Sequence, residues 1–500
     1  MRNFDGIVAE SRQAAEVDQT SIEQFGVPSV ALMETAGSKT ADEVAARTSP
    51  GDLIGILCGK GNNGGDALAA ARQLHASERR IAIFMVLGDK GLSEDAATNY
   101  SILQAIEAET GENFFCNSVE ELAGYGPALW VDGIFGTGLN SEVREPVRSV
   151  LSEVNNHAAP VLALDIPSGL DGTSGQVLGE AIQAEITVMY GMAKLGAYLN
   201  TGPACCGNRK VVPLGFTGPA KKHLKRYILT PDVAIPVPAE SYQHKYEAGI
   251  VYIAAGSEGM TGAVVTAAKA AWSAGAGGVV VLCPQGLINT FEYLLPEAVK
   301  IPVGNKEDKW FTTDHLKPVL DSIQTRHPHV LLGGPGAGAR EQTTAFYKEL
   351  LGSYEGKLIY DADALRSVEQ IPEDRPGKQQ LLLTPHRGEF SRIAGDKPGD
   401  DFELLQMAEE LAGAHSCAIV VKGEPSVVTN GNETWITAYS TRAFNRFGFG
   451  DLLAGFIAAR FLHRGREEAC IAAMLEGYRR LKDVSTGNAG YIPKPLDLIR

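Results

Sequence analysis

Four glycines, two asparagines and an aspartate stand together in one short segment of the chain. The segment reads Gly59-Lys60-Gly61-Asn62-Asn63-Gly64-Gly65-Asp66. It follows the apolar run 53–58, which predicts a buried parallel strand, and it precedes a predicted helix at 67–75. Glycines let backbone N–H groups approach an anion closely, and the start of a helix favours negative charge. The segment predicts an anion-binding loop, although glycines can also serve only the turn itself.

Two further predicted strands lead into polar loops. The apolar run 128–131 leads into Asp132 and the glycine-rich loop 133–138, and the run 161–164 leads into Asp165. In an open α/β sheet, ligands bind outside the carboxyl ends of the strands. An aspartate at one strand end is often only a turn residue. Three polar loops after three apolar strands nevertheless favour one shared binding site.

These loops resemble the signature segments of the NAD(P)H-hydrate epimerases. The matching segments are Ala31 to Gly37, Asn62 to Asp66, Val131 to Gly138, Leu164 to Gly169 and Lys194 to Gly196. The resemblance covers about the first 220 residues. It implies a Rossmann-like fold, a bound potassium ion, and a substrate that is a hydrated, damaged nicotinamide dinucleotide. Ala67 departs from the pattern, because the family usually has glycine there.

The resemblance also implies roles for individual residues. Asp165 would be catalytic, and the potassium ion would be held by Asn63, Asp132 and Ser168. These three side chains offer oxygen ligands with one formal charge, which suits a monovalent ion better than zinc or a tightly bound divalent metal. The residues that would bind the substrate are Asn62, Asn63, Gly64, Gly65, Asp66, Gly136, Thr137, Gly138 and Asp165.

A second alternation of predicted strands and helices begins at Gly249. Apolar runs that predict strands occur at 250–255, 279–283, 330–332, 357–360, 381–383 and 418–421. Several of them lead into glycine-rich or polar loops. This alternation predicts a mostly parallel sheet with helices on both faces.

Near the end of the chain, Gly448-Phe449-Gly450-Asp451 opens a run at 452–462 that predicts an amphipathic helix. Backbone N–H groups at that helix start could hold the oxygens of a phosphoryl group. Asp451 is placed to remove a proton from a hydroxyl. An aspartate that only caps the helix would explain the same residues.

The second half resembles the ADP- or ATP-dependent NAD(P)H-hydrate dehydratases, which have a ribokinase-like fold. The matching segments are 256–263, 334–338, 361–365, 384–389, 422–423 and 448–451, within about residues 226–500. The resemblance implies that ADP or ATP, with Mg²⁺, phosphorylates the ring hydroxyl and that phosphate is then expelled.

By the same resemblance, Ala263, Gly338, His386 and Asp451 would bind the hydrate, and Asp451 would be the catalytic base. An isolated histidine such as His386 is more often structural, but its Pro-His-x-Gly-Glu setting favours the site. The adenine nucleotide would be bound by Lys422, Gly423, Glu424, Pro425, Ser426 and Gly450.

The chain departs from the dehydratase pattern where phosphate would bind. Arg446 to Phe449 replace the usual Thr-Gly-Gly-Thr, and Thr441 to Ala443 replace Asn-Pro-Gly. Phe447 lacks the conformational freedom of glycine, and Phe449 lacks a hydroxyl. Arg446 supplies a charge that could rebuild phosphate binding, and Arg387 replaces the proline after His386. Two alternatives therefore stay open: a small-molecule kinase of the ribokinase type, and an epimerase with a degenerate, non-catalytic C-terminal domain.

Composition agrees with an α/β enzyme of two domains that acts on a small molecule. Five hundred residues are too many for one ordinary core. A basic cluster and prolines between about 216 and 243 suit an exposed linker. We expect an epimerase domain of Rossmann-like fold at 1–222 and a dehydratase domain of ribokinase-like fold at 226–500.

The net charge and the cysteine content limit the partners and the cellular compartment that we expect. A net charge of −15 argues against a surface for nucleic acid or an anionic membrane. Seven cysteines without paired spacing, and no signal-like segment after Met1, favour the cytoplasm. No apolar run approaches the length of a membrane span. A homo-oligomer is also expected.

Overall fold

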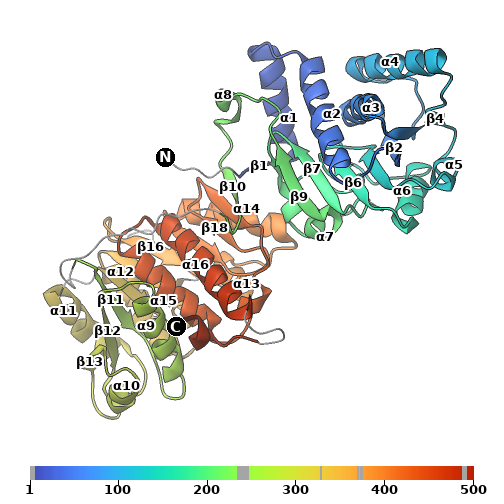
Figure 1. Cartoon of the computed structure of the whole chain (residues 1–500). Coiled ribbons are helices and arrows are strands. Elements are labelled where there is room, and N and C mark those ends of the chain that lie inside the picture. Colours follow the sequence, from blue (N-terminus) through green and yellow to red (C-terminus); the bar gives the residue numbers. More distant parts are fainter. Residues whose placement is uncertain are drawn as a thin grey trace. The chain divides into compact units, whose positions relative to one another are not determined.

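The computed structural model describes residues 6–232, 247–326, 329–368, 371, 375–486 and 492–499. The chain divides into two compact units, Met1–Ile228 and Leu229–Arg500. Figure 1 colours the first from blue to green and the second from green to red. Pro236, Pro238 and Gln243 of the predicted linker lie outside the described residues, and the domain limits at 222 and 226 stay a prediction.

The first unit is built on a seven-stranded sheet in the order β4-β3-β2-β5-β6-β7-β9, in which all neighbours are parallel. Its strands are β2 (Leu53–Cys58), β3 (Arg80–Met85), β4 (Phe115–Cys116), β5 (Leu129–Gly133), β6 (Val161–Leu164), β7 (Ile186–Tyr190) and β9 (Asn208–Val212). The chain runs outward from β2 to β4 and then returns to β5 on the other side of β2. The strand order therefore reverses between β2 and β5, which is where open α/β sheets bind ligands.

Strand β2 illustrates why the sheet is buried on both faces. Ile54 and Ile56 belong to the core with helices α2 (Ser29–Ala45), α3 (Asn62–Ala76) and α4 (Glu94–Thr110). Leu53 and Leu57 belong to the core with α5 (Val119–Gly124) and α6 (Val147–Asn156). Successive side chains of a strand point to opposite faces, so a strand covered on both sides requires an unbroken apolar run.

Shorter elements complete the first unit. Strand β1 (Ile7–Ala9) pairs antiparallel with β10 (Arg226–Leu229) and parallel with β8 (Ala193–Lys194). The other elements are α1 (Ser11–Gln19), the π-helix η1 (Thr20–Gln24), the 3₁₀-helix η2 (Leu195–Tyr198), α7 (Gly202–Cys206) and α8 (Gly218–Lys221).

Helix α3 begins earlier than the sequence predicts. Residues 62–66, expected as a loop, form its first turn, with Gly61 at the N-cap position. A Cβ at Gly64 would lie 2.1 Å from the carbonyl oxygen of Gly59, and one at Gly65 would lie 2.4 Å from Cε of Met33. Glycines therefore let the helix start directly against the end of β2 and against α2. Asp132, likewise, lies within β5 rather than after it.

In the second unit, the strands run in the order β13-β12-β11-β14-β15-β16-β17-β18-β19. They are β11 (Ile250–Ala254), β12 (Gly278–Pro284), β13 (Val299–Val303), β14 (Val330–Gly333), β15 (Lys357–Tyr360), β16 (Gln380–Leu383), β17 (Ala418–Val421), β18 (Val427–Thr429) and β19 (Thr434–Thr437). Pairing is parallel from β13 to β17, and β17 to β19 pair antiparallel. The prediction of an α/β fold with parallel sheets is confirmed.

Helices cover both faces of this sheet. Helices α11 (Leu316–Arg326), α12 (Glu341–Ser353), α13 (Arg387–Ala394) and α14 (Asp401–Ala414) share one buried core with it. Helix α15 (Phe449–Phe461) packs between α9 (Thr261–Ser273) and α16 (Arg466–Thr486), as Figure 1 shows. The remaining elements are α10 (Ile288–Leu294) and the 3₁₀-helices η3 (Gln285–Leu287), η4 (Thr313–His315), η5 (Ala362–Val368), η6 (Arg442–Phe444) and η7 (Pro495–Ile499).

Helix α15 is less amphipathic than the sequence predicts. Nine of its residues are buried: Phe449, Leu452, Ala454, Gly455, Phe456, Ile457, Ala458, Ala459 and Phe461. A Cβ at Gly455 would lie 2.3 Å from the carbonyl oxygen of Ala267, so glycine permits the close approach of α15 to α9. Among the described residues, no helix combines the length and apolar character needed to span a membrane.

Candidate functional site

A cavity of about 640 Å³ lies in the first unit at the carboxyl ends of β2, β5 and β6. Of the predicted substrate residues, Asn62, Asn63, Asp66, Gly136, Thr137, Gly138 and Asp165 line it. Gly64 and Gly65 are buried in the first turn of α3 and are not among the described lining residues. The loops predicted to converge therefore meet at the point where the strand order reverses.

Asp132 is a fully buried carboxylate beside this cavity. Ser168 donates to it twice, from Oγ to Oδ1 at 2.6 Å and from its backbone N to Oδ2 at 2.8 Å. Asn63 Nδ2 donates to the carbonyl oxygen of Phe135 at 2.9 Å, and the N–H of Phe135 donates to Ser168 Oγ at 2.9 Å. Burial raises the pKa of Asp132 to about 6, although the hydrogen bonds from Ser168 and Ile134 lower it. The backbone of Phe135 thus brings together the three residues predicted to hold a cation.

Asp165 pairs with a buried lysine. Its Oδ1 lies 2.5 Å from Nζ of Lys194, whose side chain is 4% exposed. Lys194 Nζ also donates to the carbonyl oxygen of Tyr190 at 2.8 Å. The backbone of Asp165 has a φ of 64°, in the left-handed region that non-glycine residues rarely adopt. Such strain concentrates at functional sites, and here it presents the carboxylate to both the lysine and the cavity.

Two further carboxyl groups face the same pair. Burial raises the pKa of Asp66 well above its usual value, and the charges of Asp165 and Asp18 raise it further. Burial and the charge of Asp165 also raise the pKa of Asp18. Protonated carboxyls can donate a proton to a bound hydroxyl. The sequence indicated Lys194 only as part of a matching segment, and Asp18 of α1 carried no signal, because it lies far from every glycine-rich loop.

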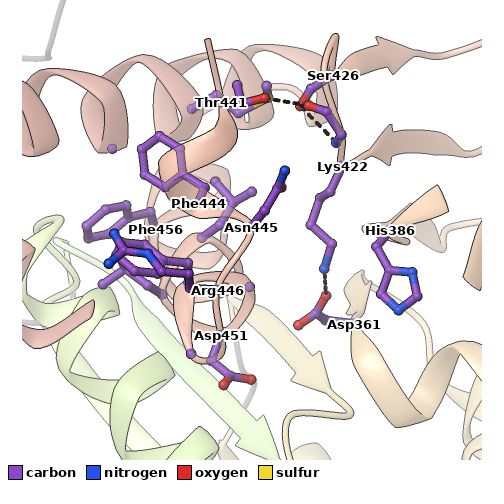
Figure 2. Close-up of a pocket in the computed structure, with 18 of the residues that line it drawn as sticks. Asp361, His386, Lys422, Ser426, Thr441, Phe444, Asn445, Arg446, Asp451 and Phe456 are labelled. Atoms are coloured by element: carbon purple, nitrogen blue, oxygen red, sulfur yellow. Dashed lines mark hydrogen bonds and ion pairs between the residues drawn. The ribbon is translucent and has the colours of Figure 1, made fainter. Parts of the chain in front are cut away.

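A second cavity, of about 810 Å³, lies in the second unit beside the start of α15. Figure 2 shows its labelled side chains. Of the predicted site residues, His386, Lys422, Gly423, Ser426, Gly450 and Asp451 line it. Ala263, Gly338, Glu424 and Pro425 are not among the described residues that do so.

Lys422 and Asp361 form an ion pair at the centre of the cavity. Lys422 Nζ lies 2.7 Å from Oδ1 of Asp361 (Figure 2). Thr384 Oγ1 donates to the same oxygen at 2.7 Å. Burial alone would lower the pKa of Lys422, but the charges of Asp361 and Glu389 outweigh it and raise that pKa. The ammonium therefore stays charged. Asp361 lay within a matching segment, but no site role was predicted for it.

Asp451 lies in the first turn of α15, beside this ion pair. Burial, followed by the charge of Asp361, raises the pKa of Asp451 to about 7, while Lys422 lowers it. A base whose pKa lies near neutrality suits proton transfer at physiological pH. Asp363 also raises the pKa of Asp451 and accepts a hydrogen bond from the backbone N of Gly338 at 2.8 Å. Gly338 is thus not among the described residues that line the cavity, but it contacts Asp363, whose charge raises the pKa of Asp451.

The altered segment 446–449 has partly become core. Phe449 is 2% exposed, whereas Phe447 is fully exposed. The guanidinium of Arg446 lies 5.0 Å from the centre of the Phe449 ring and in Figure 2 points toward Phe456, away from Asp361. Gly448 has a φ of 86° at the N-cap of α15. The segment therefore still begins the helix, but its arginine stacks on an aromatic ring.

His386 combines a structural bond with an exposed edge. Its Nδ1 accepts hydrogen bonds from the backbone N of Gly388 at 3.0 Å and of Glu389 at 3.2 Å, so it caps α13. Its side chain is nevertheless 61% exposed and faces the cavity. Capping and ligand contact are thus compatible at this residue.

Comparisons with known proteins agree with the division into two parts. Residues 29–196 match the family described as YjeF-related protein N-terminus, and residues 251–487 match NAD(P)H-hydrate dehydratase. A bifunctional NAD(P)H-hydrate repair enzyme of Salinibacter ruber is 34% identical, over 90% of this chain and 86% of that protein. One of Thermofilum pendens is 29% identical, over 99% of this chain and 97% of that protein.

Among solved structures, two resemble about half of this chain. The ADP/ATP-dependent NAD(P)H-hydrate dehydratase of Bacillus subtilis, co-crystallised with ATP and Mg²⁺, is 24% identical, with 53% of this chain and 91% of that chain covered and a TM-score of 0.45. A ribokinase-like superfamily protein of Enterococcus faecalis is 20% identical, with 55% and 93% covered and a TM-score of 0.46.

The raised pKa of Asp451 predicts a specific pH dependence of stability. Because folding raises this pKa from 3.8 to about 7, the stability contributed by the protonated carboxyl is present below about pH 4 and lost as the pH rises through about 7. Asp451→Asn cannot ionise, so its gain in melting temperature over the unmutated protein should be larger at about pH 8 than at about pH 5. Thermal denaturation followed by circular dichroism measures both. An equal difference at the two pH values would contradict the assignment.

Proposed function

Because the chain belongs to the bifunctional NAD(P)H-hydrate repair enzymes, we propose that it repairs hydrated NADH and NADPH in two steps. The first unit interconverts the R and S epimers, and the second dehydrates the S epimer to NAD(P)H with ADP or ATP as phosphoryl donor. One observation carries the proposal: each cavity holds a carboxylate in contact with a mostly buried lysine, Asp165 with Lys194 and Asp361 with Lys422, and Asp451 lines the second cavity.

For epimerisation, Asp165 is the proposed base. Inversion at the hydrated carbon requires one of its bonds to break and re-form. If Asp165 takes the proton of the ring hydroxyl, the bond from this carbon to the ring nitrogen can break, with its electron pair going to the nitrogen and a carbonyl forming at the carbon. Closure on the other face of the carbonyl and return of the proton from Asp165 then give the other epimer. Lys194 holds the carboxylate of Asp165 in place through their contact at 2.5 Å. Asp66 and Asp18, whose pKa values are raised, are the proposed groups that give a proton to the ring nitrogen and take it back.

The residues of the first unit fit a potassium ion. Asp132 is a fully buried carboxylate that accepts hydrogen bonds from uncharged donors of Ile134 and Ser168. Asn63, Asp132, Ser168 and the carbonyl of Phe135 together supply only oxygen donors of low total charge, as a weakly hydrated monovalent cation requires. When bound, potassium would supply a fixed positive charge that balances Asp132 and attracts the anionic substrate.

For dehydration, Asp451 would remove the proton of the ring hydroxyl. The hydroxyl oxygen then forms a bond to the terminal phosphorus of the nucleotide as the bond from that phosphorus to the leaving oxygen breaks. Loss of the new phosphate ester and of a ring proton restores the double bond of the nicotinamide. Bound with Mg²⁺, ADP or ATP would supply the phosphoryl group. The N–H groups that open α15 and the ammonium of Lys422 are positioned to stabilise its oxygens.

The altered segment 446–449 is the observation that favours the alternative, an epimerase with a degenerate, non-catalytic C-terminal domain. Phe449 has no hydroxyl where the family usually has threonine, and its ring is buried in the core with Arg446 stacked on it. A small-molecule kinase of the ribokinase type leaves the first cavity without a role. The homo-oligomer and the cytoplasmic location stay predictions.

One assay separates these candidates. The purified protein is incubated with mixed hydrate epimers, with and without ADP or ATP, and recovery of NAD(P)H is followed by absorbance. Nucleotide-dependent recovery of both epimers supports the proposal. Epimer exchange without recovery would indicate a non-catalytic second unit, and neither activity would contradict the proposed function.

Asp165→Asn should abolish epimer exchange, with a loss of at least about a hundredfold because the base is removed. Asparagine tolerates the left-handed backbone conformation of this position and is nearly isosteric with aspartate, so the fold should be retained. Chromatography of separated epimers measures the exchange, and dehydration of purified S epimer by the same variant is the control. Normal exchange would remove Asp165 from the mechanism.

Potassium should occupy the site at Asn63, Asp132 and Ser168. In crystals grown with potassium, we expect density coordinated by these side chains, with an anomalous signal above that of water. Asp132→Asn, which removes the formal charge of the site, should lose that signal. Only water between the three side chains of the unmutated protein would show the assignment to be wrong.

Dehydration by the unmutated protein should be detectable, but slower than in a dehydratase with the family's usual threonine at this position, because Phe449 offers no hydroxyl to phosphate. Asp451→Asn should lower the rate by about a hundredfold or more, and Arg446→Ala should reduce it less. Initial rates with ADP and with ATP measure both effects, and epimer exchange is the control. Unchanged rate and nucleotide affinity in Arg446→Ala would leave Arg446 without a role in phosphate binding.

A further inference from the structure

Arg387, which replaces the proline usual in the family, holds the turn that follows Lys422. Its Nη2 donates to the carbonyl oxygen of Glu424 at 3.0 Å and to that of Pro425 at 3.4 Å. Its Nη1 pairs with Oδ1 of Asp401 at 2.6 Å. One guanidinium therefore joins the backbone of the turn to the mostly buried carboxylate that opens α14.

The side chain of Arg387 also packs flat over Gly423. A Cβ at Gly423 would lie 2.6 Å from Nε of Arg387, 3.3 Å from its Cδ and 3.4 Å from its Cγ. Any larger residue at 423 would therefore displace the arginine. Gly423 and Arg387 are matched to each other in this chain, and glycine is needed there for the approach of a side chain rather than for a special backbone angle.

Arg387 acts on the turn from outside the cavity. Gly423 and Ser426 line the cavity, and Arg387 is not among the described residues that do so. Within the turn, Ser426 Oγ donates to the carbonyl oxygen of Gly423 at 2.7 Å, and the backbone N of Ser426 donates to Thr437 Oγ1 at 2.9 Å. These bonds fix the two ends of the turn, whereas the carbonyls of Glu424 and Pro425 between them are held by Arg387.

We infer that Arg387 is a positioning residue for nucleotide binding, which rests on the proposed role of 422–426 as the nucleotide turn. The planar guanidinium presents its donors in a fixed fork, so it can hold two carbonyls and a carboxylate at once. A turn held in its binding conformation loses less entropy when the ligand binds. Arg387 also directly follows His386, so the same residue connects the proposed hydrate contact with the nucleotide turn.

The test measures the dissociation constants of ATP and ADP by isothermal titration calorimetry on the full chain. Arg387→Gln keeps a donor for Asp401 but cannot also reach both carbonyls, and it should weaken binding by about tenfold. Arg387→Lys keeps the charge without the fork and should fall between. Gly423→Ala, which displaces the arginine without removing it, should weaken binding in the same direction.

Arg392→Gln is the matched control. Arg392 lies on α13, the same helix as Arg387, but it is exposed and is not among the described residues that line the cavity. A surface substitution away from such contacts changes the free energy little, so this variant should bind nucleotide within about twofold of the unmutated protein. In steady-state dehydration, Arg387→Gln should raise KM for the nucleotide with little change in kcat, because Arg387 does not contact the reacting atoms.

The outcomes distinguish this inference from the proposed function. An unmutated protein that binds neither ATP nor ADP would overturn both. Normal binding by the unmutated protein and by Arg387→Gln would overturn the positioning role alone. If Arg387→Gln fails to fold, as judged by a lowered melting temperature in circular dichroism, Arg387→Lys and Gly423→Ala decide: unchanged affinity in both refutes the inference, and weakened affinity in both supports it.

Discussion

A charged lysine that is largely buried against a carboxylate, at the carboxyl end of a parallel sheet, is the constraint that both units share. Removing an ammonium and a carboxylate from water costs several kcal/mol for each ion, which the pair recovers only with close contact and further hydrogen bonds. Lys194 obtains these from Asp165 and the carbonyl of Tyr190, and Lys422 obtains them from Asp361. Both arrangements require strands that end at one edge and helices that exclude water from the sheet. The apolar runs and the glycine-rich helix starts are consequences of that requirement.

The sequence alone predicts features that depend on residues close together in the chain, and it misses features that depend on tertiary packing. The apolar runs predicted the parallel strands, because strands covered on both faces need unbroken hydrophobic sequence. The loops after β2, β5 and β6 converge as expected, because parallel strands share one carboxyl edge. The start of α3 at Asn62 and the contribution of Asp18 were missed. Both depend on tertiary packing: α3 starts where Gly64 and Gly65 fit against β2 and α2, and α1 brings Asp18 to a cavity whose motifs lie elsewhere.

Segment 446–449 departs from the family's sequence pattern but keeps the backbone conformation that begins α15. Gly448 still supplies the left-handed residue before α15, so the helix begins where Asp451 falls in its first turn. Phe449 exchanges a polar contact for burial, and an aromatic side chain of that size stabilises a core by a few kcal/mol. Arg446 then finds a cation–π partner in the same ring, worth roughly 0.5–1 kcal/mol at an exposed site. Packing between α9 and α16 thus maintains the helix start at a segment that departs from the family's sequence pattern.

The two proposed activities support each other without any requirement for contact between the units. Epimerisation is an equilibrium, so it does not by itself remove damaged cofactor. Dehydration of the S epimer is drawn forward by phosphoryl transfer from a nucleotide, and each turnover removes S from that equilibrium. The R epimer is then converted by mass action as S is removed, whichever of the two steps is slower. Fusion into one chain ensures that both units are made in equal amounts.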